Sequence, residues 1–124
     1  MDINDLSSKV IGAAIEVHKH LGPGLLESVY QKCLAYELND IGLEVREEVL
    51  LPIKYKKLSL EHAFRADIVV NNQLVIELKA VDNINPVAVA QLLSYLKMGR
   101  YPLGLLINFN VLQLRQGIKR IINK

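Results

Sequence analysis

The 124-residue chain lacks several features that would restrict its class at once. It has a single cysteine, Cys33, which excludes a disulfide within the chain and agrees with a reducing compartment. Cys33 stands among apolar residues with helical spacing, so we expect a small buried side chain rather than a nucleophile. No apolar run approaches the ~20 residues that a membrane-crossing helix requires.

Signals for export and a strong charge of one sign are missing too. Asp2 and Asp5 stand where a secretory signal carries positive charge, and no apolar segment follows them. We therefore expect a soluble, cytoplasmic protein with no membrane partner. The net charge of +2 is too small to indicate nucleic acid by itself. Two basic clusters can touch phosphates, although a solvated charged face is the favoured interpretation of both: Lys54, Lys56 and Lys57, and Arg115, Lys119, Arg120 and Lys124.

The order of the elements follows from hydrophobic periodicity and turn residues. Helical spacing predicts helices over residues 5–20, 25–41 and 86–98, and strand patterns cover residues 45–55, 58–70, 73–81 and 103–109. Asn71-Asn72 is typical of a tight turn between antiparallel strands, and Pro86 suits the first turn of a helix. Residues 111–122 fit a strand or a helix equally well. Without a repeat or linker, residues 1–124 form one α/β domain with a mixed sheet flanked by helices.

Charged residues stand in the middle of an apolar strand pattern. Side chains alternate along a strand, so Val75, Glu77 and Lys79 share one face, opposite Leu74, Ile76 and Leu78. Apolar neighbours on every side mark an interior strand, where a carboxylate and an ammonium group lose hydration unless something compensates them.

The hairpin turn brings a second carboxylate close. A turn centred on Asn71-Asn72 places Asp67 opposite Ile76, and a shift of one residue or a bulge would put Asp67 and Glu77 on the same face. Two carboxylates suit a hard cation such as Mg²⁺, which activates water and neutralises charge on a phosphoryl oxygen, while Lys79 can stabilise that charge. The alternative is a buried Glu77–Lys79 ion pair with Asp67 at a strand end. The residues alone leave both interpretations open.

Further segments carry a family resemblance, namely Gly24-Leu-Leu-Glu-Ser-Val-Tyr30, Arg65-Ala-Asp67, Ile76-Glu-Leu-Lys-Ala-Val81, Gln91-Leu-Leu-Ser-Tyr-Leu96 and Gly104-Leu-Leu-Ile-Asn-Phe109. With them the chain resembles the PD-(D/E)XK nuclease superfamily and, more closely, the small bacterial GxxExxY family. The resemblance covers nearly the whole chain in order. It implies a restriction-endonuclease-like αβββαβ core, which matches the order of elements predicted above.

The resemblance also implies roles for single residues. Asp67 matches the first metal-binding acid, Glu77 the second, and Lys79 the lysine, with Ala66 where the superfamily name has proline. Glu27 matches an additional acid near the metal, and Gln91 a polar position beside the site. Spacing adds two supporting residues, because Tyr30 shares a helix face with Glu27 and Tyr95 shares one with Gln91. We expect the face of Gln91 and Tyr95 to be separate from the stripe that packs on the sheet, which consists of Val89, Leu92, Leu93 and Leu96.

The function implied is that of a phosphodiesterase acting on nucleic acid with Mg²⁺ or Mn²⁺. The alternative is a non-catalytic module that keeps the nuclease fold and binds nucleic acid or protein. So small a core would need a second copy, as a homodimer, or a protein partner to grip a duplex. The histidines do not suggest a metal site, because His18 and His20 point in different directions on a helix, and His62 is expected at the surface.

Overall fold

Two helices begin the chain. The computed structural model describes residues 1–61 and 63–124 in full, and the side chain of His62, expected at the surface, lies outside the described residues. Helix α1 (Ile3–Leu21) begins where the Asp2 carboxylate accepts the Asn4 backbone N–H at 2.9 Å, and it ends at Gly22, whose φ of 69° suits glycine. Helix α2 (Glu27–Asp40) begins two residues later than the pattern predicted, because Leu26 is still extended.

A five-stranded mixed sheet forms the centre of the molecule. Its strands, in the order in which they pair, are β1 (Val45–Tyr55), β2 (Leu58–Val70), β3 (Leu74–Lys79), β4 (Leu103–Asn108) and β5 (Ile118–Ile122). Only β3 and β4 are parallel, and helix α3 (Pro86–Gly99) connects them. The segment left undecided between strand and helix contains a short 3-10 helix, η1 (Leu114–Gly117), followed by β5. The predicted α/β architecture is confirmed.

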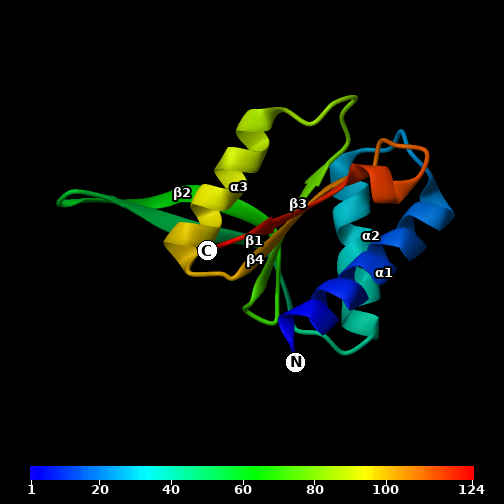
Figure 1. Cartoon of the computed structure of the whole chain (residues 1–124), viewed down its shortest axis with the longest axis horizontal. Helices are drawn as coiled ribbons and strands as arrows, with labels where there is room; N and C mark the ends of the chain where they lie inside the picture. Colours follow the sequence, from blue (N-terminus) through cyan, green and yellow to red (C-terminus); the bar gives the residue numbers. More distant parts are fainter.

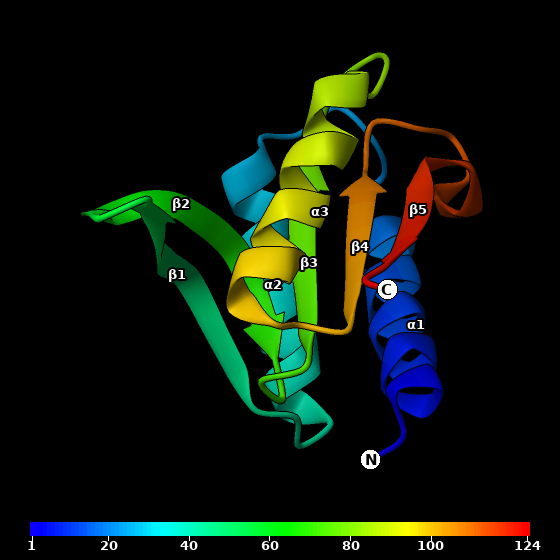
Figure 2. The same cartoon turned by 60° about the vertical axis from the view of Figure 1, so that its left-hand side comes forward.

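The helices cover the two faces of the sheet unequally (Figures 1 and 2). Helices α1 and α2 lie on one face, and α3 lies on the other. The central strand β3 shows the predicted alternation, since Leu74, Ile76 and Leu78 pack in the core under α1 and α2, whereas Val75 packs under α3 with Leu92 and Leu96. Within the described residues no helix combines the length and the apolar character needed to cross a membrane.

The hairpin between β2 and β3 has a three-residue turn. Val70 pairs with Leu74, Asn71 and Asn72 take left-handed φ values of 50° and 56°, and the Gln73 backbone N–H donates to the Val70 carbonyl at 3.0 Å. Gln73 therefore belongs to the turn and not to the strand. The ladder pairs Ile68 with Ile76, so the prediction that Asp67 lies opposite Ile76 is wrong by one residue. This register is the one that turns Asp67 and Glu77 toward the same face.

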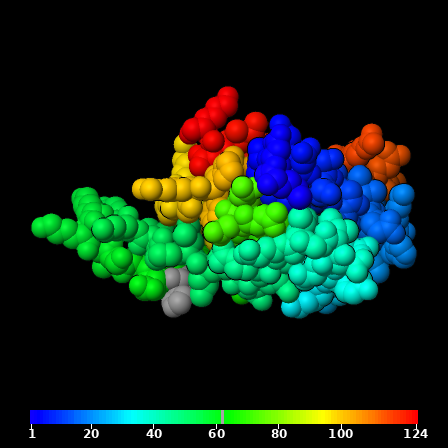
Figure 3. Space-filling model, turned by 90° about the horizontal axis from the view of Figure 1, so that it is seen from below, coloured from blue at the N-terminus to red at the C-terminus, as the bar shows by residue number. Residues whose placement is uncertain are grey.

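The far ends of β1 and β2 extend beyond the rest of the molecule as a projecting hairpin (Figure 3). β1 is an edge strand, and its pairing with β2 shifts register between Leu51 and Ile53, at Pro52. Proline has no N–H to give to a ladder, which explains why it stands at an irregular point of an edge strand. The hairpin beyond Pro52 has no helix over it.

Candidate active site

Strands β2 and β3 stop pairing just before the two acids. Their ladder begins at the turn and ends at Ile68 and Ile76, and side chains replace it beyond that point. The Leu78 backbone N–H donates to Asp67 Oδ2 at 2.8 Å, and the Asp67 backbone N–H donates to Glu77 Oε1 at 3.1 Å. Each carboxylate thus accepts a hydrogen bond from the backbone of the opposite strand, and these two bonds bring the acids together.

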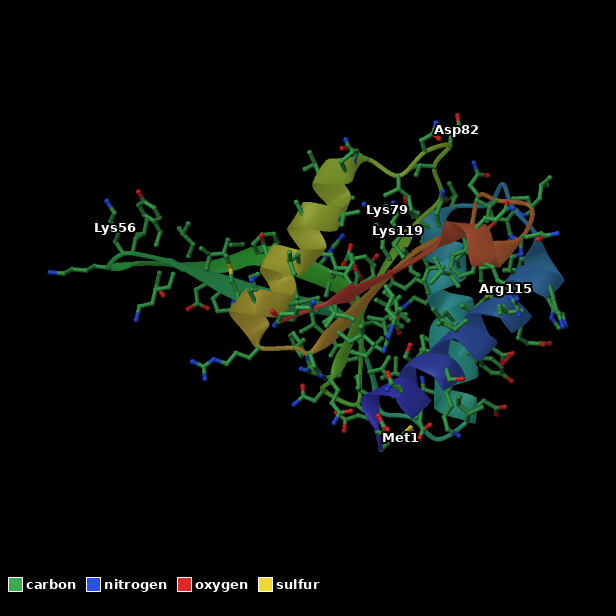
Figure 4. The ribbon with its side chains drawn as sticks, in the orientation of Figure 1. Met1, Lys56, Lys79, Asp82, Arg115 and Lys119 are labelled. Atoms are coloured by element: carbon green, nitrogen blue, oxygen red, sulfur yellow. The ribbon has the colours of Figure 1, made fainter. Side chains whose placement is uncertain are left out.

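A cavity of about 270 Å³ opens where the strands part. Its lining includes six residues of the predicted site or beside it: Glu27, Arg65, Asp67, Glu77, Lys79 and Gln91. Tyr95 also lines it, from α3. Figure 4 shows Lys79 in the middle of the molecule, beside the sheet, rather than on an outer helix. The structure therefore brings together all but one of the residues singled out from the sequence.

Burial opposes the charge on both acids. It raises the pKa of Glu77 to about 7, and repulsion from Asp67 is the next cause. The pKa of Asp67 is raised as well, again mainly by burial, although the hydrogen bond from Leu78 acts in the opposite direction. Glu27 raises both pKa values further, and Lys79 lowers both. A cation that binds between such crowded carboxylates offsets their repulsion and stabilises their charged form.

Lys79 approaches the acids without closing an ion pair. The ion pairs within 4.0 Å among the described residues are Glu16–His20, Lys32–Glu47 and Glu48–Arg65, all at the exposed surface. The alternative of a buried Glu77–Lys79 pair is therefore not formed. Lys79 stays half-buried on the Glu77 face of β3, where its charge reaches the cavity.

Glu27 joins the site from a distant part of the sequence. It is the first residue of α2, where the helix dipole favours a carboxylate. Its Oε2 accepts the Ala80 backbone N–H at 3.2 Å, directly after Lys79. This contact ties the start of α2 to the end of β3.

The donor set fits a hard divalent cation that keeps part of its water. Among the described residues no three His, Cys, Asp or Glu side chains stand close enough to form a complete metal cage. The second oxygen of each central acid, Asp67 Oδ1 and Glu77 Oε2, accepts no hydrogen bond from the described residues. Mg²⁺ is commonly bound by one or two carboxylates plus water and phosphate oxygens. Asp67 and Glu77 supply the two carboxylates.

Helix α3 contributes a tyrosine that the sequence placed differently. Tyr95 was expected beside Gln91 on a flank separate from the packing stripe, which is wrong, since Tyr95 is buried with Leu92 and Leu96. Its hydroxyl donates to the Val49 carbonyl at 3.1 Å, which satisfies the polar end of a buried ring. Burial, followed by repulsion from Tyr101, raises the pKa of Tyr95 to about 12. Tyr95 therefore remains a neutral donor.

Tyr30 does not line the cavity. Its hydroxyl donates to the Gly22 carbonyl at 2.6 Å and accepts the Leu25 backbone N–H at 3.1 Å, and its ring stacks on Phe109 at 4.4 Å. These contacts hold the loop that precedes Glu27. Spacing on a helix correctly related Tyr30 to Glu27, but it did not show that the hydroxyl turns back to the loop.

Two other expectations concern His18, His20 and Cys33. His18 Nε2 lies 2.8 Å from the Val111 carbonyl and His20 Nδ1 lies 3.1 Å from the Glu16 carbonyl, so the two rings do not converge. Cys33 is half-buried against the core under α1 and α2, less enclosed than predicted. Sequence reasoning gave no role to Arg65, although its place two residues before Asp67 on the same strand was the available signal.

Comparison with known proteins agrees with this arrangement. A family model described as "PD-(D/E)XK nuclease superfamily" matches residues 4–121. The chain belongs to the PD-(D/E)XK nuclease superfamily. No curated protein matches it. A solved structure described as "Crystal structure of SSO0001" is similar in fold, with a TM-score of 0.59 and 22% sequence identity. The match covers 78% of this chain and 50% of that one, so the chain spans half the length of that relative.

The match expected from the sequence places Asp67, Glu77 and Lys79 at the lettered positions of the superfamily name, with Ala66 in place of the proline. Ala66 is fully buried in the core under α3. Ala66 is not among the residues that line the cavity, so its presence in place of proline leaves the acids and the lysine where they are.

Proposed function

We propose that this PD-(D/E)XK protein is a metal-dependent phosphodiesterase that cleaves nucleic acid. The observation that carries the proposal is the meeting of Asp67 and Glu77 from neighbouring strands in one cavity, with Lys79 on the same strand face as Glu77. Two carboxylates and an ammonium group in one cavity suit the hydrolysis of a phosphate ester. The carboxylates can bind a cation, and the ammonium group can stabilise negative charge on a phosphate oxygen.

Asp67 and Glu77 would hold Mg²⁺ or Mn²⁺, with Glu27 close by, directly or through water. When bound, such an ion lowers the pKa of its water and neutralises charge on a phosphoryl oxygen. Lys79 would orient the attacking water or hold a phosphate oxygen with its compact ammonium group. Gln91, exposed on α3 at the cavity, would donate to the sugar–phosphate backbone.

We also propose that the chain belongs to the GxxExxY family within this superfamily. Each of the three residues that the family name specifies has a structural part in the site. Gly24 takes a φ of 96°, Glu27 reaches the Ala80 N–H, and Tyr30 holds the intervening loop. The motif thus delivers a third carboxylate to the cavity.

A second candidate is a non-catalytic module that binds nucleic acid or protein through the same fold. The small net charge and the lack of a complete metal cage among the described residues favour it. The retained Asp67, Glu77 and Lys79 argue against it, because a site without chemistry has no need of crowded acids whose pKa values are raised.

The experiment is a cleavage assay paired with Mn²⁺ calorimetry. Labelled DNA and RNA, single- and double-stranded, are incubated with Mg²⁺ or Mn²⁺ and wild type, Asp67→Asn, Glu77→Gln or the control Asp40→Asn, an exposed acid at the end of α2. We expect wild type and the control to bind Mn²⁺ and to cut, and both site variants to lose cleavage and Mn²⁺ binding. A wild type that binds Mn²⁺ and cuts no substrate would favour the non-catalytic module.

A further inference from the structure

One projecting segment of the chain carries an excess of positive charge. We define the arm as residues 53–61, the far end of the β1–β2 hairpin, which contains Lys54, Lys56 and Lys57 and one acid, Glu61. The chain has 15 Lys and Arg and 13 Asp and Glu, so twelve of each lie outside the arm. The arm therefore accounts for the whole net charge of +2.

The arm is exposed and built as a regular hairpin. Ile53 pairs with Leu60 and Tyr55 with Leu58, and Lys56 turns the chain with a φ of 54°. Every residue of the arm except Ile53 is exposed. Figure 4 shows Lys56 at the far end of the molecule, well away from the helices. The three lysines of the arm are thus exposed to solvent and do not pack in the core.

The arm begins at the rim of the candidate active site. Phe64 and Arg65 of β2 line the cavity, and Arg65 pairs with Leu50 of β1. Tyr55 lies five positions beyond Leu50, which at ~3.3 Å per residue places the tip roughly 15–20 Å from the cavity wall. A duplex rises 3.4 Å per base pair, so this reach corresponds to about five base pairs.

We propose that the arm binds the backbone of the nucleic-acid substrate roughly 15–20 Å, the length of about five base pairs, from the phosphate bound at the candidate active site. Lys54, Lys56 and Lys57 contact phosphates, and Tyr55 offers an exposed ring to a base. This inference rests on the proposed function, since it takes the cavity as the place of the scissile phosphate. The arm adds binding surface that the candidate active site of so small a domain lacks.

Charge and aromatic content decide the class of partner. Tyr55 is 61% exposed, and the Lys56 ammonium lies 5.4 Å from the centre of its ring. Cationic side chains around an exposed aromatic ring are typical of surfaces that bind single strands and flexible ends of nucleic acid. Leu58 and Leu60 are exposed too, and they suit a second copy of the chain. Three lysines within four positions would repel their counterparts in such a pairing, which favours the polyanion.

The test measures binding without cleavage. Fluorescence anisotropy in EDTA, over 50–300 mM salt, compares wild type with K54Q/K56Q/K57Q on 30-nucleotide DNA and RNA, as single strands and as duplexes. The matched control is K9Q/K19Q/K97Q, which removes three exposed lysines outside both basic clusters. We expect the slope of log affinity against log salt to fall in magnitude by about 2–3 in the arm variant, since each phosphate contact contributes ~0.7–0.9. The control should keep the wild-type slope.

Several outcomes would overturn the proposal that the arm binds nucleic acid. It fails if a folded arm variant, checked by its melting curve, keeps the wild-type slope and affinity, or if wild type binds no nucleic acid at 50 mM salt. Light scattering that shows a wild-type dimer and a monomeric arm variant, with equal slopes, would assign the arm to a second copy instead. Failure of the proposed function looks different, because wild type would then bind with an arm-dependent slope and still leave every substrate uncut with Mg²⁺ or Mn²⁺.

Discussion

Glu77 is the residue in which burial and charge conflict most. Its pKa in the folded chain is about 7, above the ordinary 4.5, so the folded state holds the proton at pH values where the unfolded chain has released it. Without metal, stability is therefore highest below pH 4.5 as far as Glu77 is concerned, and it falls as the pH rises toward and through 7. We expect the melting temperature in EDTA to decline between pH 5 and 8.

Glu77→Gln provides the control for this prediction. The amide has nearly the same shape and does not titrate, so the variant should lose the Glu77 part of the decline while Asp67 continues to contribute. An equal decline of the melting temperature with pH in wild type and Glu77→Gln would contradict the assigned pKa of Glu77.

Lys79→Ala tests the cationic partner of the acids. We expect cleavage to fall by ~10²–10³, the usual effect of removing one electrostatic contact to the transition state. Lys79 forms no ion pair within 4.0 Å among the described residues, so the melting temperature should change little. Lys79→Arg should rescue poorly because a planar guanidinium does not replace a compact ammonium group. Lys97→Ala, at an exposed position on α3, is the matched control. Unaltered cleavage by a folded Lys79→Ala variant would remove Lys79 from the mechanism.

At the scale of elements, the loop between α1 and α2 depends on a single hydroxyl. Tyr30→Phe keeps the ring on Phe109 but leaves the Gly22 carbonyl without its donor. We expect the free energy of unfolding to fall by ~1–3 kcal/mol, the cost of an unsatisfied buried polar group. Urea titration followed by circular dichroism measures it, with Tyr36→Phe, whose ring is 69% exposed, as the control. Equal losses in the two variants would show that the hydroxyl does not hold this loop.

The junction of η1 and β5 with β4 depends on a glycine. A Cβ at Gly117 would collide with the Asn108 backbone carbonyl, which cannot move aside as a flexible side chain would. Asn108 itself is buried, and its amide bonds to both the N–H and the carbonyl of Val81.

Gly117→Ala should therefore lower the free energy of unfolding by about 1–3 kcal/mol or more, as overpacking does. Gly12→Ala, in a helix with open space around it, should instead be neutral or raise stability by up to ~1 kcal/mol. Urea titration of both variants measures the difference. A Gly117→Ala variant as stable as Gly12→Ala would contradict the close approach.

At the scale of the whole molecule, we expect self-association. A chain of 124 residues has little surface with which to hold a duplex, and β1 lies at the edge of the sheet. Light scattering from micromolar to millimolar concentration should reveal a dimer. A monomer mass throughout this range would leave a protein partner, or the arm alone, to complete the grip.

The sequence by itself determined the parts of the fold that depend on near neighbours. The bounds of β1 and β2 agree with prediction because alternation and turn residues mark them locally. The start of α3 follows from Asn85, which accepts the Val87 N–H at 2.9 Å, and from Pro86 at the first turn. The shared face of Glu77 and Lys79 needs only the period of a strand. The resemblance, carried by short motifs, indicated the superfamily that the family model then showed.

Only the tertiary structure decided how these parts meet. The left-handed Asn71 and Asn72 make a three-residue turn, and one residue of register determines whether Asp67 faces Glu77 or turns away. Glu27 reaches Ala80 across 53 positions of sequence, and the direction of the Tyr30 hydroxyl depends on a loop that helical spacing does not describe. Local patterns report the faces of single elements. The distances between functional groups arise from turns and packing, in which small differences in φ move side chains from one face of the sheet to the other.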